Sequence, residues 1–182
     1  MRLFTGIALP SHVLDRLLTL CSGVPGARWQ DREQMHLTLR FIGEVDGKSF
    51  DDMRLALAQV RSSQFSLTLD SVGHFGERKR VHALWVGVPM VRELIALRDR
   101  IESVLVRYGQ EPESRKYKPH VTLARLRDAP LDRVVSFLSA NALFLAGPFA
   151  VEEFHLYSSH PGGGGSLYRI EESYPLNVVG AS

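Results

Sequence analysis

Residues 36–39 read His-Leu-Thr-Leu, and residues 120–123 repeat the pattern as His-Val-Thr-Leu. The chain contains seven histidines and five threonines, so random placement would give well under one His-x-Thr combination. Both copies lie in stretches rich in β-compatible apolar residues. Because side chains alternate between the two faces of a strand, each histidine shares a face with its threonine and the apolar residues point the other way. The sequence therefore predicts two strands that each present one imidazole and one hydroxyl, backed by a hydrophobic core.

Two such strands facing a common groove would bring two histidines and two hydroxyls together. An imidazole titrates near neutral pH, so one ring can be protonated while the other is neutral. The neutral ring can take a proton from a nucleophile, and the protonated ring can give one to a leaving oxygen at a phosphodiester. The hydroxyls of Thr38 and Thr122 can hydrogen-bond the non-bridging phosphate oxygens. The competing interpretation, that His36 and His120 are only half-buried structural residues, weakens for a matched pair.

The rest of the chain alternates strands and helices and ends in strands. Strands are predicted at 2–9, 36–45, 65–76, 81–88, 120–126, 149–158 and 167–174, and helices at 11–22, 48–61, 89–109 and from 131 onward. This order is typical of an α+β fold, with strands paired mainly through hairpins and helices packed on sheets. The glycine run at 162–165 predicts a hairpin loop, since no helix follows it to hold a phosphate.

Composition describes an ordinary globular protein, because 45% of the 182 residues are hydrophobic and 23% are charged. These values exclude a disordered, collagen-like or disulfide-rich chain. A single cysteine, Cys21, cannot form an internal disulfide, which favours a reducing compartment. The apolar run at the N-terminus is too short for a signal peptide, and the roughly 18 consecutive apolar residues of a membrane span are missing. We therefore expect a cytoplasmic protein with no membrane partner.

The net charge of +2 at pH 7 identifies no partner by itself. Basic residues gather in two clusters, one at residues 78–80 and one formed by Arg115, Lys116 and Lys118. A solvated surface is one interpretation of these clusters, and an anionic ligand is the other. The remaining histidines lack the spacing of a zinc site, and no Gly-rich phosphate loop precedes a helix. The sequence therefore predicts neither a metal nor an organic cofactor.

The two motifs and their flanks resemble the two-histidine (2H) phosphoesterase superfamily. Within it, the flanks are similar to the bacterial and archaeal RNA 2',3'-cyclic phosphodiesterases, historically called 2'-5' RNA ligases. The similar segments are residues 2–10, Trp29, residues 39–45, residues 118–125, and the terminal pattern of residues 156–158, Tyr168 and residues 174–176. These segments are spread over nearly the whole chain and occur in the same order as in members of the family.

The resemblance implies one bilobal phosphoesterase domain over residues 1–182, with one motif in each lobe (36–39 and 120–123). Its fold would be α+β, with two mainly antiparallel β-sheets, outer helices and pseudo-twofold symmetry around a central cleft. The implied reaction is metal-independent hydrolysis of an RNA 2',3'-cyclic phosphate end to a 2'-phosphate. Matching the two motifs to those of the family implies that His36 is the proton donor and His120 the proton acceptor. The spacing alone leaves the two roles exchangeable. The partner would be RNA with such an end, for example tRNA halves or nucleotides, bound by a monomer.

Arg125 is a further candidate, as a cation that clamps the phosphate together with Thr38 and Thr122. Its odd offset from His120 turns it away from the groove on a regular strand, so it reaches the site only through a bulge or a bent side chain. Phe41 has the same parity and is expected in the core. Tyr117 and Lys118 are expected in an exposed loop, with a place beside the cleft as the alternative.

Three other functions remain open from the residues. Reversible 2'-5' ligation of RNA ends would use the same two histidines, with a hydroxyl attacking instead of water. A non-catalytic module that binds RNA ends would hold a phosphate without turnover. A phosphodiesterase for a small cyclic phosphate is also compatible, because the base specificity of the groove is not legible in the sequence.

Overall fold

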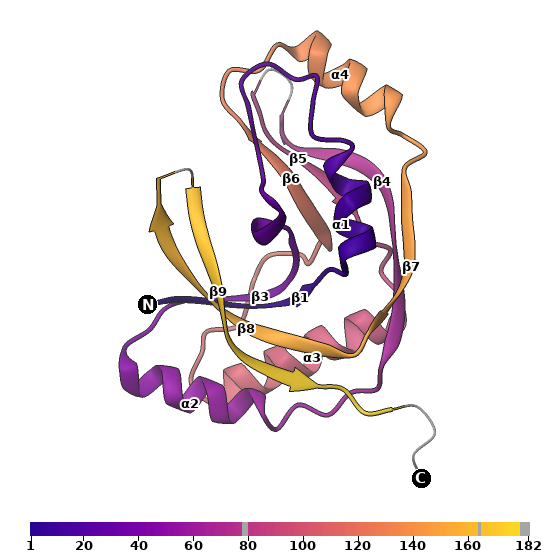
Figure 1. Cartoon of the computed structure of the whole chain (residues 1–182). Coiled ribbons are helices and arrows are strands. Elements are labelled where there is room, and N and C mark those ends of the chain that lie inside the picture. Colours follow the sequence, from indigo (N-terminus) through magenta and orange to yellow (C-terminus); the bar gives the residue numbers. More distant parts are fainter. Residues whose placement is uncertain (78–79, 164, 179–182) are drawn as a thin grey trace.

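The computed structural model describes residues 1–77, 80–163 and 165–178 (Figure 1). The elements, in chain order, are β1 (Arg2–Ala8), α1 (Ser11–Leu18), β2 (Ala27–Trp29), the 3-10 turn η1 (Arg32–Gln34), β3 (His36–Glu44), α2 (Gly47–Leu57), β4 (Phe65–Glu77), β5 (Arg80–Gly87), α3 (Arg92–Arg107), β6 (His120–Leu126), α4 (Leu131–Ala140), β7 (Leu145–Val151), β8 (Glu153–Gly162) and β9 (Gly165–Pro175). The predicted α+β class is confirmed. Each strand that pairs along the sheet does so in the antiparallel sense.

The strands follow the order β7-β4-β5-β6-β3-β1-β8-β9, and β2 adds to β6. The family resemblance implies two sheets, whereas hydrogen bonding joins the strands into one continuous sheet. The link between the halves is narrow, because β3 and β6 share only the register pair Leu37↔Val121. Both side chains are fully buried. The two motif strands therefore meet at one pair of core residues and diverge on either side of it.

The helices divide between the two halves (Figure 1). Helix α3 packs against α2 and β3, and α1 packs against β7 at the other end of the strand order. Helix α4 reaches β2 through the rings of Phe137 and Trp29, whose centroids lie 5.8 Å apart. None of the helices in the described ranges has both the length and the apolar character needed to cross a membrane.

The strand predicted at 149–158 is wrong as a single element. The structure has two strands there, β7 and β8, which pair with β4 and β1 in opposite halves of the molecule. Tertiary pairing separates them at Glu152, where no turn residue marks a break in the sequence. Strand β2 was not expected either, because its three residues are too few for a periodic signal.

The predicted glycine hairpin is confirmed by the pair Gly162↔Gly165, which closes β8 onto β9; Gly164 lies outside the described residues. Of the basic cluster at residues 78–80, Arg78 and Lys79 also lie outside them. Arg80 opens β5 and is exposed.

The joint between the halves should dominate stability. Replacing Leu37 by Ala removes a fully buried side chain where neighbouring strands cannot close the gap, so we expect a loss of about 2–5 kcal/mol in the free energy of unfolding. The matched control is Leu143→Ala, at a residue 93% exposed, with an expected change within about 0.5 kcal/mol. Urea unfolding of both variants measures the difference. Equal midpoints would show that the joint is not a stability determinant.

Candidate active site

His36 and Thr38 lie on the cleft side of β3, and His120 and Thr122 lie on the cleft side of β6. All four side chains are partly buried, while the apolar residue after each is fully or almost fully covered. Extending the antiparallel register from Leu37↔Val121 by one residue places His36 across from Thr122 and Thr38 across from His120. The narrow joint between the halves thus brings the two motifs together, as the sequence predicts.

Both motif strands carry a bulge directly after the His-x-Thr residues. Leu39 is the extra residue of β3 opposite Thr5–Gly6, and Leu123 is the extra residue of β6 opposite Leu84–Trp85. An extra residue shifts the alternation of the strand by one position. The burial patterns change in step, with two consecutive buried residues followed by an exposed one in each strand.

The bulges bring Phe41 and Arg125 to the same face as the histidines. Each lies five residues after its histidine, a position that a regular strand would turn away from the cleft. The expectation that Phe41 belongs to the core is wrong, since its side chain is 46% exposed and lines the cavity. Arg125 was predicted to reach the cleft only if a bulge or a bent side chain redirected it. The bulge in β6 does so, and Arg125 lines the cavity.

The hydrogen bonds assign the same tautomer to both rings. Nδ1 of His36 lies 2.8 Å from the Gln34 carbonyl oxygen, and Nδ1 of His120 lies 2.7 Å from that of Lys118. A carbonyl only accepts, so each Nδ1 carries the proton and the Nε2 of a neutral ring is an acceptor. Nε2 of His36 lies 3.0 Å from Oγ1 of Thr38, which donates to it. For Nε2 of His120, the described residues supply no protein partner.

The electrostatic surroundings favour neutral rings. The pKa of His36 is lowered from its ordinary value of 6.5 to about 4, first by burial and then by the charges of His120 and Arg125, against the raising effect of the hydrogen bond to the Gln34 carbonyl. The pKa of His120 is also lowered, first by burial and then by the charges of Arg125 and Lys118. Arg125 therefore acts on both rings. A site arranged in this way attracts an anion, which would offset the cost of a protonated ring.

Aromatic side chains surround each imidazole. The His36 ring lies 4.7 Å from the ring of Phe4 and 5.0 Å from that of Tyr168. The His120 ring meets the Phe75 ring edge to face at 4.7 Å. These contacts exclude water from the backs of the rings and fix their orientation. The residues around His36 come from β1 and from the C-terminal hairpin, two segments that the family resemblance singles out in the sequence without giving them a role.

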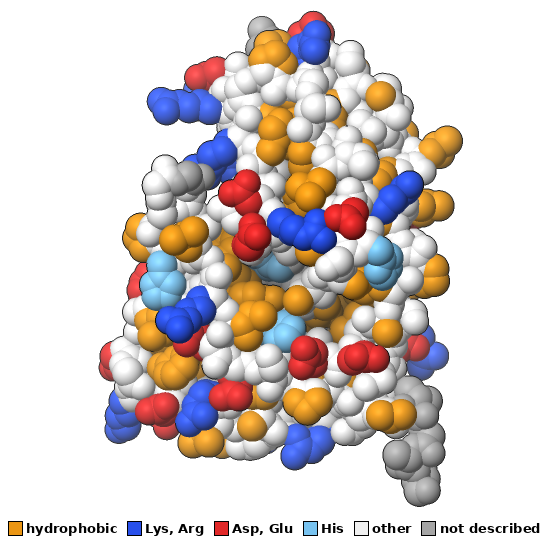
Figure 2. All heavy atoms as spheres, in the orientation of Figure 1, with side chains coloured by type: hydrophobic (Ala, Val, Ile, Leu, Met, Phe, Trp, Pro, Cys, Tyr) orange, Lys and Arg blue, Asp and Glu red, His pale blue; other side chains and the backbone are white. Residues whose placement is uncertain are grey.

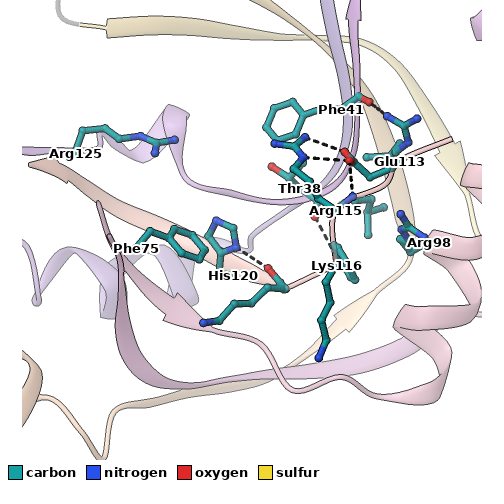
Figure 3. A pocket seen from close by; sticks show the side chains of 13 residues that line it. Thr38, Phe41, Phe75, Arg98, Glu113, Arg115, Lys116, His120 and Arg125 are labelled. Atoms are coloured by element: carbon teal, nitrogen blue, oxygen red, sulfur yellow. Dashed lines mark hydrogen bonds and ion pairs between the residues drawn. The ribbon is translucent and has the colours of Figure 1, made fainter. Parts of the chain in front are cut away.

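The cleft holds a cavity of about 380 Å³ between the motif strands and the segment that leads into β6. Its wall includes Thr38, Phe41, Phe75, Tyr117, His120 and Arg125. Figure 3 shows Phe41 and the Glu113–Arg115 ion pair at one end, and Phe75 and His120 at the other. Figure 2 shows histidine side chains in the hollowed centre of this face.

The segment that leads into β6 is a loop in which Lys118 is exposed, as predicted, whereas Tyr117 is half-buried. Both side chains line the cavity, which was the alternative prediction. The Tyr117 hydroxyl donates to the Thr38 carbonyl oxygen at 3.1 Å. Buried Arg40 forms an ion pair with Glu102 of α3, and that carboxylate accepts the backbone N–H of Glu113 at 2.7 Å. The basic cluster Arg115, Lys116 and Lys118 thus lines the cavity.

Comparison with known proteins identifies the family to which this chain belongs. The sequence profile described as the 2'-5' RNA ligase superfamily matches residues 22–163, which include both motifs. The chain belongs to the 2'-5' RNA ligase superfamily. An Aeropyrum pernix protein named RNA 2',3'-cyclic phosphodiesterase is 35% identical over 150 residues, covering 81% of this chain and 85% of that protein. The Escherichia coli protein of the same name is 31% identical over 92% of each chain.

Solved structures show the same architecture for this superfamily member. Escherichia coli LigT in complex with 3'-AMP superposes with a TM-score of 0.77 at 30% identity, covering 96% of this chain and 97% of that one. The protein TT0787 of Thermus thermophilus has a TM-score of 0.79 at 24% identity and supports the fold alone. A crystal structure of LigT with phosphate is also similar, with a TM-score of 0.72 at 28% identity.

In this protein, two other clusters of polar side chains lie outside the cleft. His155 is buried on β8, and its Nδ1 lies 2.9 Å from Oγ of Ser173 on β9. His160 contacts Ser158, whose hydroxyl donates to Glu171. Over the described ranges, no group of three or more His, Cys, Asp or Glu side chains is arranged to hold a metal ion.

The protonation of His36 can be followed directly by NMR of the ring nitrogens. In the free protein we expect its midpoint near pH 4, because burial and Arg125 disfavour the imidazolium. Inorganic phosphate should raise that midpoint. The unfolded chain binds this proton first, so the free energy of unfolding should also fall as the pH drops from about 6.5 to about 4. A His36→Asn variant assigns the signal, and a midpoint at or above 6.5 without phosphate would contradict the expectation.

Proposed function

We propose that this protein hydrolyses the 2',3'-cyclic phosphate at an RNA end to a 2'-phosphate, with His36 and His120 as a general acid and base. The observation that carries the proposal is the pair of imidazoles in one tautomer, placed diagonally across the Leu37↔Val121 joint, with the Thr38 hydroxyl 3.0 Å from Nε2 of His36. The names of the Aeropyrum pernix and Escherichia coli relatives support the same reaction.

The reaction requires one proton to be removed and one to be delivered. Nε2 of neutral His120 accepts a proton from water as the water oxygen bonds to phosphorus. The bond from phosphorus to the ribose 3'-oxygen breaks, and Nε2–H of protonated His36 gives its proton to that oxygen. The phosphate stays on the 2'-oxygen. Each ring thus exchanges one proton, and a second exchange with solvent restores the starting state.

Charge neutralisation comes from the protein's own side chains in this proposal. Arg125 faces the negative phosphate, and the hydroxyls of Thr38 and Thr122 donate to its non-bridging oxygens. When His36 is protonated, its Nε2 no longer accepts from Thr38, so that hydroxyl is released to bind phosphate. The mechanism assigns no step to a metal ion.

The roles of the two rings follow the family pattern, with support from their surroundings. Nε2 of His120 is free to accept a proton from water, as a general base requires. Burial lowers the pKa of His36 strongly in the free protein, and a bound substrate anion offsets the cost of the charged ring. The ring then takes up a proton from solvent and gives it to the leaving oxygen. The exchanged assignment would make His120 the donor to the leaving oxygen.

We further propose that residues 1–182 act as one bilobal domain whose halves are related by a pseudo-twofold axis through the joint. The strand order supports this, because β6, β5 and β4 on one side correspond to β3, β1 and β8 on the other. The equivalent bulges in the motif strands support it as well. Since both motifs come from one chain, a monomer holds a complete site.

The first test uses an RNA oligonucleotide that ends in a 2',3'-cyclic phosphate, in excess EDTA. We expect turnover to a 2'-phosphate, identified by phosphorus NMR, with a bell-shaped dependence on pH. His36→Ala and His120→Ala should each lower kcat by about 10²- to 10⁴-fold, the usual contribution of a general acid or base. His12→Ala, at an exposed residue of α1, is the control.

The outcomes of this test separate the alternatives. Loss of activity in EDTA would mean that a metal takes part. Binding without turnover would indicate a module that recognises RNA ends. A joined product, when RNA with a free 5'-hydroxyl is added, would indicate ligation at the same site.

Arg125 can be tested separately from the histidines. Arg125→Gln removes the cation that faces the phosphate, so we expect kcat/KM to fall at least about tenfold. The pKa values of both histidines should rise in the free variant, because the charge of Arg125 lowers them. Arg92→Gln, at the exposed start of α3, is the matched control. A kcat/KM equal to that of the wild type would exclude Arg125 from the site.

A further inference from the structure

A second aromatic surface lies beside the catalytic pair and has no role in the proposed reaction. Phe75 of β4 and Trp85 of β5 lie with their ring centroids 5.5 Å apart. The ammonium group of Lys118 lies over both rings, 4.5 Å from the Trp85 centroid and 5.4 Å from that of Phe75. In the free protein a cation thus covers an aromatic surface at the edge of the cleft.

The neighbouring strand holds the indole flat. Gly73 of β4 pairs with Trp85, and a Cβ on Gly73 would come within 2.1 Å of the indole ring. Only glycine therefore leaves room for Trp85 to lie across the β4 backbone. The indole Nε1 is buried and lacks a hydrogen-bond partner among the described residues. The ring face under Lys118, rather than the N–H group, is what a ligand would meet.

This surface leads away from the reacting phosphate. Trp85 pairs with Thr122 in the register of β5 and β6, so it lies one strand away from the motif. Beyond it lies a second cavity of about 510 Å³, whose wall includes Trp85, Met90 and Lys118. Lys116, Tyr117 and Lys118 line both cavities. The surface around Lys118 therefore connects the catalytic cavity with the second one.

We propose that Trp85 and Lys118 form a subsite for the nucleotide that precedes the cyclic phosphate end. The base of that nucleotide stacks on Trp85, and the Lys118 ammonium moves from the indole to the phosphodiester that links the two nucleotides. Aromatic faces bind any base by stacking, and a lysine neutralises a backbone phosphate. Phe41 remains available for the terminal base at the other end of the cavity. This inference rests on the proposed function.

The experiment compares two substrates, adenosine 2',3'-cyclic phosphate and the adenylate dinucleotide with the same cyclic end. The readout is the ratio of their kcat/KM values, in which any effect on His120 common to both substrates cancels. We expect the wild type to favour the dinucleotide. Trp85→Leu should lower the ratio about tenfold, as expected for the loss of one stacked base. Lys118→Gln should lower it less and weaken its dependence on salt.

The controls separate this inference from a structural effect. Lys48→Gln removes an exposed lysine at the start of α2 and should leave the ratio unchanged. Trp85→Phe keeps an aromatic face and should retain part of the preference, with thermal unfolding reporting on the fold. A ratio unchanged in Lys118→Gln and Trp85→Leu, or equal losses on both substrates, would overturn the subsite.

Binding tests the subsite independently of turnover. Titration calorimetry compares adenosine 2'-monophosphate with the dinucleotide that ends in a 2'-phosphate. Tighter binding of the dinucleotide, lost in Lys118→Gln, supports the subsite even if the protein hydrolyses neither cyclic substrate, in which case the proposed function fails alone. Equal affinities in the wild type would overturn the subsite, whatever the activity.

Discussion

The burial of one cross-strand pair, Leu37 against Val121, is the constraint on which the arrangement of this protein depends. It is the only register pair between β3 and β6, and both side chains are shielded from solvent in the core. Strand alternation then sends the residues on either side of the pair to the opposite face, where the two histidines and two threonines gather. The hydrophobic effect that joins the halves thus also positions the polar groups. A slip of one residue in this register would bury the imidazoles and expose the core.

The bulges after the motifs extend the polar face beyond what alternation allows. Regular strands would give two histidines and two hydroxyls, but no cation and no exposed aromatic ring at the fifth position. The extra residues Leu39 and Leu123 shift the alternation and bring Phe41 and Arg125 into the cleft. The two equivalent positions differ in chemistry, because one offers an aromatic surface and the other a positive charge. The cleft is therefore similar in backbone on its two sides and different in the groups it presents.

The sequence predicted the motif pair because alternation and hydrophobic burial are local rules. It predicted the class of the fold and most helices and strands for the same reason. The position of Phe41 could not be predicted, because a bulge depends on how a neighbouring strand pairs. The division of the stretch around Glu152 into β7 and β8 likewise depends on partners far away in the chain. The wall formed by Tyr117 depends on the anchoring of Glu113 by Glu102 of α3, a contact that no local pattern reveals.

In the proposed reaction, the electrostatics of the cleft make the protonation of the two histidines depend on the bound ligand. Burial and Arg125 keep both imidazoles neutral in the free protein, and two neutral rings offer two bases and no acid. A bound phosphate anion reverses the balance at the ring that protonates, because the ion pair it forms there offsets the cost of burying the charge. Arg125 attracts that anion and opposes protonation in its absence. The same cation that lowers both pKa values thus favours proton transfer only when a phosphate is in place, so the acid would form where the leaving oxygen is.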